Sequence, residues 1–342
     1  MATSKIVQFH RTGPPEVLQV DNCSDQEPLP TEVNISIKAF GLNRAECMLR
    51  QGVYAFDPIF PCRLGGEGSG TITALGSNIV DYSQGERVAV IPFALADEFG
   101  YWKDETGKYG CYGESVTVPI EAVVRVPDNI TSTQSAASWM QYLTAWGGLI
   151  HNAYLTNNDT VLITAGSSSA ALGGIQLSKD LGATVIATTR SKDKIDRLKD
   201  AGADYALNYE DRDFVNNVMD ITNGKGVSVI YDPVSGATSN NLVDAAAPEA
   251  RIVCYGNLDP KNVSFTALAA LTKRISIKFY SLYDVTRRPT LLKKAHQYVY
   301  ERLSNGIFVP VIDSIFQGLE KSVDAHKKME SNQQFGKIVV EV

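Results

Sequence analysis

The chain has 342 residues, which is enough for two domains of ordinary size. Hydrophobic residues make up 44% of it and charged residues 20%, a composition that excludes a disordered or fibrous protein. The formal charge of -6 argues against nucleic acid or an anionic membrane as a partner, and no run reaches the roughly 18 apolar residues of a membrane span.

The N-terminal segment, MATSKIVQFHRTG, has no apolar signal core and reads as the start of a strand. Five cysteines are scattered along the chain: Cys23, Cys47, Cys62, Cys111 and Cys254. This odd, dispersed set favours reduced thiols over a disulfide framework, although one pair stays open. We therefore expect a cytoplasmic protein.

Short strands with glycine punctuation dominate the first part of the chain. Residues 33–39 alternate with period two, and the glycine-rich residues 65–70 precede an apolar run at 71–75. Residues 85–92 read as a turn, a strand and a stop at Pro92. Residues 1–127 are therefore expected to form a β-rich domain with a curled or barrel-like sheet.

Helical and strand patterns alternate from residue 128 to about 285. Helices are predicted at 132–152, 192–201, 211–222 and 239–247, with strands at 161–163, 183–189, 205–207, 227–231, 251–255 and 275–279. Such alternation predicts an α/β domain, residues 128–285, with a parallel sheet covered on both faces. Residues 286–342, with a helix at 290–304 and a final strand at 336–342, are expected to return to the first domain.

Residues 160–194 form the most informative segment, because a strand, a small-residue turn, a helix and a second strand follow one another. Every residue from 165 to 171 is Ala, Gly or Ser, but the tight part of the turn has only one glycine, Gly166. The backbone can still approach a pyrophosphate, with hydroxyls from Ser167, Ser168 and Ser169 and with Ala170 at the helix start. A small-residue helix start packed on a sheet is the alternative.

The end of the second strand bears on the choice of cofactor. About 20 residues beyond the turn, an NAD site presents an acid to the ribose, whereas an NADP site tends to present a base. Here Thr189 and Arg190 end the strand, Lys194 follows, and the first acid after the strand end is Asp193. These residues favour NADP(H), since a guanidinium suits a phosphate. A solvated basic helix start is the alternative.

The order of these pieces resembles the medium-chain dehydrogenase/reductase superfamily. Segments across nearly the whole chain look like its zinc-free quinone oxidoreductase branch, which includes zeta-crystallin-like proteins: Gly41–Glu46, Leu64–Gly70, Gly85–Val88, Leu143–Trp146, Leu181–Val185, Ala201–Asp204, Tyr231–Val234 and Phe335–Val340. The resemblance implies a Rossmann-type doubly wound parallel sheet plus a GroES-like barrel domain.

Zinc is not expected. Zinc-dependent members carry a catalytic Cys where this chain has Asn43 and a His where it has Gly66, and Cys111 is isolated where a structural zinc needs four Cys. The four histidines, His10, His151, His296 and His326, are read as surface or helix residues rather than as a metal cluster. Glu67 is expected to be structural, since without zinc its partner charge is gone. Without a Lewis acid, conjugated substrates such as quinones, enones and enals are favoured.

The resemblance also implies roles for individual residues. Asn43 would donate to the developing oxyanion, and Tyr54 would either donate to it or relay a proton, with a half-buried aromatic as the alternative for Tyr54. Thr144 is expected at the cofactor and Tyr142 at the pocket wall, with helix packing as the alternative for both. The other expected cofactor contacts are Tyr209, Tyr255, Asn257, Phe279, Phe335 and Lys337, and Tyr280 is expected near the substrate.

The function expected from the sequence is NADPH-dependent, zinc-independent reduction of quinones or α,β-unsaturated carbonyl compounds. A dedicated biosynthetic ene-reductase for one metabolite, or a nucleotide-binding protein with little catalysis, remains open. Because family members pair their Rossmann sheets edge to edge, the resemblance also implies a homodimer through the strand at residues 275–278.

Overall fold

The structure is a computed structural model that describes residues 3–92, 107–236, 239–259 and 263–342. The chain forms two compact units, one made of Met1–Met140 with Thr286–Val342 and the other of Gln141–Val285. The first unit extends past residue 127, the limit expected from the sequence, because helix α2 (Ser132–Ala136) packs on strands of that unit.

The first unit is built around two sheets. The larger runs in the order β15 (Ile312–Gln317), β16 (Lys337–Glu341), β3 (Glu32–Gly41), β5 (Gly68–Leu75), β6 (Arg87–Val90) and β8 (Val123–Arg125), and β7 (Ser115–Pro119) also pairs with β3. The smaller runs β2 (Leu18–Ser24), β1 (Thr3–Phe9), β4 (Cys62–Arg63). Residues Val33, Ile35 and Ile37 of β3 point into a buried core, as the period-two pattern predicts. The C-terminal strand β16 lies antiparallel to β3, so residues 300 positions apart are neighbours.

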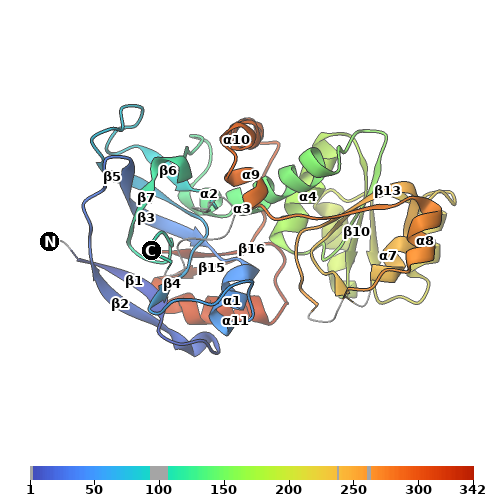
Figure 1. The fold of residues 1–342 in the computed structure, drawn as a ribbon, viewed down its shortest axis with the longest axis horizontal. Helices are drawn as coiled ribbons and strands as arrows, with labels where there is room; N and C mark the ends of the chain where they lie inside the picture. Colours follow the sequence, from blue (N-terminus) through green and yellow to red (C-terminus); the bar gives the residue numbers. More distant parts are fainter. Residues whose placement is uncertain (1–2, 93–106, 237–238, 260–262) are drawn as a thin grey trace. The chain divides into compact units, whose positions relative to one another are not determined.

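Helices α1 (Arg44–Gln51), α10 (Pro289–Ser304) and α11 (Ser322–Glu330) complete this unit, together with the 3-10 turns Pro15–Val17, Ile120–Ala122 and Leu319–Lys321. Helix α1 begins at a capping box between Asn43 and Glu46 and ends at Gly52, which adopts the left-handed conformation. It contacts α11, and Figure 1 shows the two helices side by side. The sequence patterns predict neither helix.

The second unit contains a parallel sheet in the order β11 (Tyr205–Asn208), β10 (Thr184–Thr189), β9 (Thr160–Ile163), β12 (Val227–Asp232), β13 (Ala246–Cys254) and β14 (Ser276–Phe279). This confirms the expected doubly wound fold class. The strand order reverses between β9 and β12, and in open sheets ligands bind at such a switch point, outside the carboxyl ends of the strands.

Helices cover both faces of this sheet (Figure 1). Leu162, Ile186 and Ile230 share one buried cluster with side chains of α6 (Phe214–Ile221) and α7 (Ser239–Ala245). On the other face, Gly174 of α4 (Ser169–Asp180) lies against Tyr231. Among the described residues, this unit also contains α5 (Ile195–Asp200), preceded by a 3-10 turn at Lys192–Lys194, α8 (Ala267–Lys273) and α9 (Tyr283–Thr286). No described helix is both long and apolar enough to cross a bilayer.

The helix expected at residues 132–152 is not continuous. It is divided into α2, α3 (Trp139–Ala145) and a π-helix (Trp146–Asn152). The two glycines of the π-helix explain the tight packing: a Cβ on Gly147 would overlap the Tyr280 hydroxyl, and one on Gly148 would lie 2.5 Å from Cε2 of Tyr231. π-Helical turns are frequent at functional sites.

Candidate active site

The turn after β9 packs closely against the neighbouring backbone and leads into the N-terminus of helix α4. Ala165 has φ +48°, a conformation that glycine would adopt more easily. The Gly166 amide donates to the Thr188 carbonyl at 2.7 Å, and a Cβ on Gly166 would meet that oxygen at 2.9 Å. Ser168 caps α4, since its Oγ accepts from the Ala171 amide at 3.3 Å. The amides at the start of this 12-residue helix have no acceptor within the helix, which makes its N-terminus suitable for an anion.

Residues at the ends of the adjacent strands approach this turn. The Lys194 ammonium donates to Ser167 Oγ at 3.3 Å, and the Tyr209 amide donates to the Thr189 carbonyl at 2.9 Å. Thr189 is buried, whereas Arg190 directly after it is exposed. The structure therefore brings these residues together at the carboxyl ends of β9, β10 and β11.

A buried carboxylate that the sequence did not suggest as a site residue joins the strands on either side of the switch point. Asp232 at the end of β12 accepts from the Thr164 hydroxyl, from the Val234 amide at 3.1 Å and from the Ser235 amide at 2.8 Å. Burial raises the pKa of this carboxyl, and the hydrogen bonds oppose that effect. Asp232 thus fixes the loop after β9 against the loop after β12.

Aromatic residues follow the last two strands. Tyr255 stacks on Tyr231 with ring centroids 3.9 Å apart, and Tyr280 is buried beneath the π-helix. Burial raises the pKa values of the Tyr255 and Tyr280 hydroxyls, so both stay protonated at neutral pH. Asn257 and Phe279 are exposed, and the 62% exposure of Phe279 shows that its ring is not part of the core of this unit.

Tyr142 and Thr144 of α3 are both buried. The Tyr142 hydroxyl donates to Oε1 of Gln176 in α4 at 2.9 Å, and the Tyr142 side chain has no exposed surface. These contacts agree with the helix-packing alternative for Tyr142, and its expected role at the pocket wall stays a prediction. No structural observation tests the expected cofactor contact of Thr144.

In the first unit, Asn43, Glu46, Glu67 and Lys337 form a buried polar cluster. The Glu46 carboxylate accepts from the backbone N–H groups of Asn43 and Gly66, both at 2.8 Å. The Lys337 ammonium donates to Asn43 Oδ1 at 2.6 Å and pairs with Glu67 Oε1. Lys337 and Glu67 are both fully buried. Because the two form an ion pair, Glu67 does have a partner charge, and the expectation that it lacks one is wrong.

Three contacts surround Asn43 Nδ2, and all are long. They reach Gly41 O at 3.4 Å, Glu46 Oε1 at 3.3 Å and Glu67 Oε1 at 3.3 Å. Ordinary amide hydrogen bonds are about 2.9–3.0 Å, so Nδ2 is weakly bound whereas Oδ1 is firmly bound.

The cluster continues toward α11. The Tyr112 hydroxyl donates to Glu46 Oε2 at 2.9 Å and lies 3.1 Å from His326 Nε2, while Arg50 Nε donates to His326 Nδ1 at 3.3 Å. Since Nδ1 accepts from Arg50, Nε2 carries the imidazole proton. Burial, with the charge of Arg50, lowers the pKa of His326 to about 3. His326 is thus a neutral core residue.

Neither candidate metal position suits zinc. Where the resemblance implies the catalytic zinc of zinc-dependent members, this chain has Asn43 and Gly66 in place of the Cys and His ligands, and the Lys337 ammonium lies beside Asn43 and Glu67. The sequence analysis did not predict a second group, in which possible ligand atoms of Cys47, His326 and Glu330 lie within 4.8 Å of one another.

An arginine dominates that second group. Arg50 binds His326 Nδ1 and pairs with Glu330, so a cation would face its guanidinium. Burial also raises the pKa of the Cys47 thiol to about 12, so zinc would have to displace a firmly held proton to bind the thiolate.

Tyr54 and Phe335 are the remaining residues expected at the site. Tyr54 is half-buried beside Phe56, with ring centroids 5.2 Å apart. Burial, with the charge of Glu46, raises the pKa of the Tyr54 hydroxyl, so it stays a donor. Phe335 is buried, and its amide donates to Asp313 Oδ1 at 2.7 Å.

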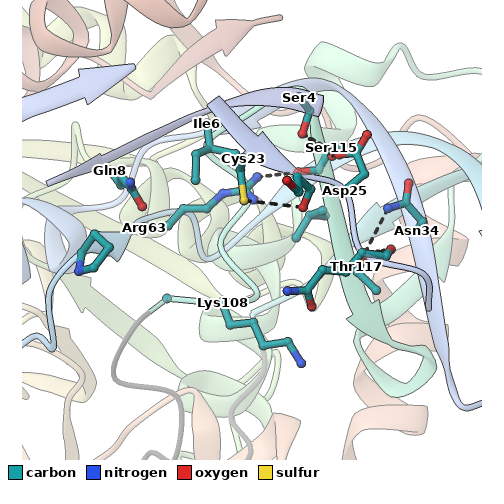
Figure 2. Close-up of a pocket in the computed structure, with 15 residues that line it drawn as sticks. Ser4, Ile6, Gln8, Cys23, Asp25, Asn34, Arg63, Lys108, Ser115 and Thr117 are labelled. Atoms are coloured by element: carbon teal, nitrogen blue, oxygen red, sulfur yellow. Dashed lines mark hydrogen bonds between the residues drawn. The ribbon is translucent and has the colours of Figure 1, made fainter. Parts of the chain in front are cut away.

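A cavity of about 250 Å³ lies in the first unit beside β1, β2, β4 and β7. Figure 2 shows the residues that line it. Arg63 lines it and donates to the carbonyls of Tyr112 at 3.1 Å and Ser115 at 2.7 Å, while Asp25 accepts from Ser4 and Ser115. None of the residues expected at the active site lines this cavity.

Comparisons with known proteins agree with this geometry. The alcohol dehydrogenase GroES-like domain matches residues 29–128, and the zinc-binding dehydrogenase domain matches residues 171–297. The chain is 32% identical over 254 residues to a quinone oxidoreductase of Pseudomonas aeruginosa, covering 74% of each protein.

Two solved structures are also similar. An NAD-dependent alcohol dehydrogenase superposes with a TM-score of 0.90 at 27% identity over 99% of both chains. A quinone oxidoreductase of Escherichia coli in complex with NADPH gives 0.87 at 25% identity over 100% of both chains.

The chain therefore belongs to the medium-chain dehydrogenase/reductase superfamily, in its zinc-free quinone oxidoreductase branch. Its similarity to quinone oxidoreductases indicates that it is an oxidoreductase.

Proposed function

We propose that this protein is an NADPH-dependent, zinc-independent reductase of quinones or α,β-unsaturated carbonyl compounds. The observation that carries the cofactor choice is the basic end of β10. Arg190 and Lys194 flank it, and Lys194 already lies against Ser167 of the turn. These two cations would attract the anionic 2′-phosphate of NADPH, whereas the neutral 2′-hydroxyl of NADH would gain little from them.

The small-residue turn suits a pyrophosphate. The residues proposed to hold the cofactor are Thr144, Ser167, Ser168, Ser169, Ala170, Thr189, Arg190, Lys194, Tyr209, Tyr255, Asn257 and Phe279. The amides of Ser169 and Ala170 would donate to phosphate oxygens, and no side chain larger than a hydroxymethyl group blocks the approach. The bound nicotinamide supplies the hydride, so the protein need only orient the substrate and stabilise the charge that develops on it.

On the substrate side, we propose Tyr54 as the principal donor to the substrate oxygen. Its pKa is raised, so the phenol holds its proton until an oxyanion develops. Asn43 is proposed as a second donor, because its Nδ2 contacts are long and a full oxyanion competes well for an amide hydrogen. Lys337 offers no exposed surface, so we do not retain it as a direct cofactor contact. Phe335 and Tyr280, both almost fully buried, would at most border the site.

NADPH oxidation across a panel of quinones and enones tests this function. Turnover of several quinones, faster with NADPH than with NADH, is expected. One strongly preferred enone would instead indicate a dedicated ene-reductase. NADPH binding with no turnover on any panel member would contradict the proposal and favour a binding protein.

We also propose a homodimer in which two sheets join through β14. This strand ends the sheet order, and an unpaired edge is a template for another strand. Leu268 and Leu271 on the neighbouring helix α8 are 72% and 75% exposed. Analytical ultracentrifugation should give twice the chain mass, and Ile277→Pro should give the monomer; a monomeric wild type would contradict the proposal. A cytoplasmic location stays a prediction.

A further inference from the structure

The buried cluster of the first unit is organised around one ammonium group. Lys337 comes from β16 and has 0% exposed surface, as does its partner Glu67 next to β5. The other Glu67 oxygen accepts from the Met140 amide at 2.9 Å, so the carboxylate is held from two sides. The positive charge also acts on Glu46, where it opposes the burial that raises the pKa of that carboxyl.

The backbone makes room for this lysine. A Cβ on Gly41 would lie 2.6 Å from Lys337 Cε, and it would overlap the Ala136 carbonyl. Gly41 is the last residue of β3, the strand that pairs with β16. A glycine at this position is therefore needed for the lysine stem to cross β3 and reach Asn43.

The ammonium, together with the Glu46 backbone amide of the capping box, fixes how the Asn43 carboxamide is oriented, because both groups are donors to its oxygen. An ammonium donates and cannot accept, so only Oδ1 of Asn43 suits the position 2.6 Å from Lys337 Nζ. The amide nitrogen is then directed away from Lys337, toward its three long contacts. A strong hydrogen bond to the carbonyl oxygen also polarises the amide and makes its N–H groups better donors.

We propose that Lys337 is a positioning residue, a built-in cation that takes the electrostatic place of a metal ion and acts on the substrate through Asn43. This inference rests on the proposed function. Asn43 is 8% exposed, whereas the ammonium and Glu67 are inaccessible, so any effect on the substrate must pass through the carboxamide. A buried ion pair is weak evidence for stability, because neutral residues of similar shape are often as stable.

The test uses a neutral replacement of both charges. Glu67→Gln and Lys337→Met should each lower the melting temperature by roughly 5–15 °C, since each leaves one buried charge unpaired. The double variant should melt within about 5 °C of the wild type, which makes its kinetics interpretable. Glu86→Gln with Arg125→Met is the matched control, since this 2.6 Å pair joins the residue before β6 to β8 of the same sheet but is partly exposed.

In the double variant, kcat should fall at least tenfold, roughly the loss of one well-oriented donor, while the NADPH dissociation constant changes less than about twofold. In an Asn43→Ala background, the same double change should alter kcat less than about twofold, because the residue that transmits the effect is gone. A double variant with wild-type kcat, or an equal loss in the Asn43→Ala background, would overturn the proposal.

A readout independent of turnover separates this inference from the proposed function. If the wild type reduces no quinone or enone, the function fails, but a crystal structure of the double variant still tests the positioning. The Asn43 carboxamide should then turn or become disordered. An unchanged carboxamide, with Oδ1 in its present place, would refute the role of Lys337.

Discussion

Removing the two cations at the end of β10 should weaken the binding of NADPH much more than the binding of NADH. The change is Arg190→Ala combined with Lys194→Ala. Lys194 is half-buried and 3.3 Å from Ser167 Oγ, so its contact with a phosphate is worth about 1.5–2 kcal/mol. Arg190 is exposed, so about 1 kcal/mol is appropriate for it. Together they give about 2.5–3 kcal/mol, or roughly 100-fold weaker NADPH binding.

Calorimetric titration of the folded variant with NADPH and NADH measures this difference. NADH affinity should change less than about threefold, because its ribose carries no phosphate. Lys199→Ala with Lys225→Ala is the control, since both side chains are exposed and the net charge changes equally. Equal losses for NADPH and NADH, or an NADPH loss no larger than in the control, would refute the 2′-phosphate role.

Three further predictions concern the first unit and the π-helix. Tyr54→Phe should lower kcat about tenfold or more with the NADPH dissociation constant unchanged; unchanged kcat in steady-state assays would remove Tyr54 from the reaction. The folded-state pKa of His326 is about 3, below its unfolded value of about 6.5. The contribution of neutral His326 to the free energy of unfolding is therefore fully present above pH 6.5 and is lost as the pH falls toward 3. Between pH 7 and pH 4.5, the free energy of unfolding should fall by about 2–3 kcal/mol less in His326→Gln than in the wild type. Urea unfolding at both pH values measures this difference, and an equal fall in the two proteins would contradict the reasoning. Gly147→Ala should destabilise the protein by about 1–3 kcal/mol, because its Cβ would overlap the Tyr280 hydroxyl; an unchanged unfolding midpoint would argue against this packing.

The alternation of apolar runs and helical spacing was sufficient to predict the parallel sheet of the second unit. Its strands fall where short runs rich in Val and Ile occur, for example at Val227–Asp232. The boundary between α7 and β13 was less accurate, since the helix expected to reach residue 247 ends at Ala245 and the strand begins at Ala246. Alanine-rich sequence favours a helix locally, and here the pairing of β13 with β12 determines the outcome.

The nucleotide turn could be found from sequence because its residues are neighbours along the chain or follow successive parallel strands. Lys194 and Ser167, which contact each other, lie within one βαβ unit. Parallel strands place their carboxyl ends at one edge, so the order of the elements already predicts which residues meet.

The polar cluster could not be found in this way. Lys337 and Glu67 are 270 positions apart, and Cys47 and His326 are 279 positions apart. No local periodicity predicts such contacts, because they depend on how β16 and α11 pack on the first unit. The missing zinc ligands were visible in the sequence, but the lysine beside them was not.

Calorimetric titration of the wild-type protein with NADPH and with NADH tests the central claim most directly. Saturable NADPH binding at one site per chain, at least tenfold tighter than NADH binding, is expected from the small-residue turn and the two cations beside it. Tighter binding of NADH, or no binding of either dinucleotide to the folded protein, would contradict it.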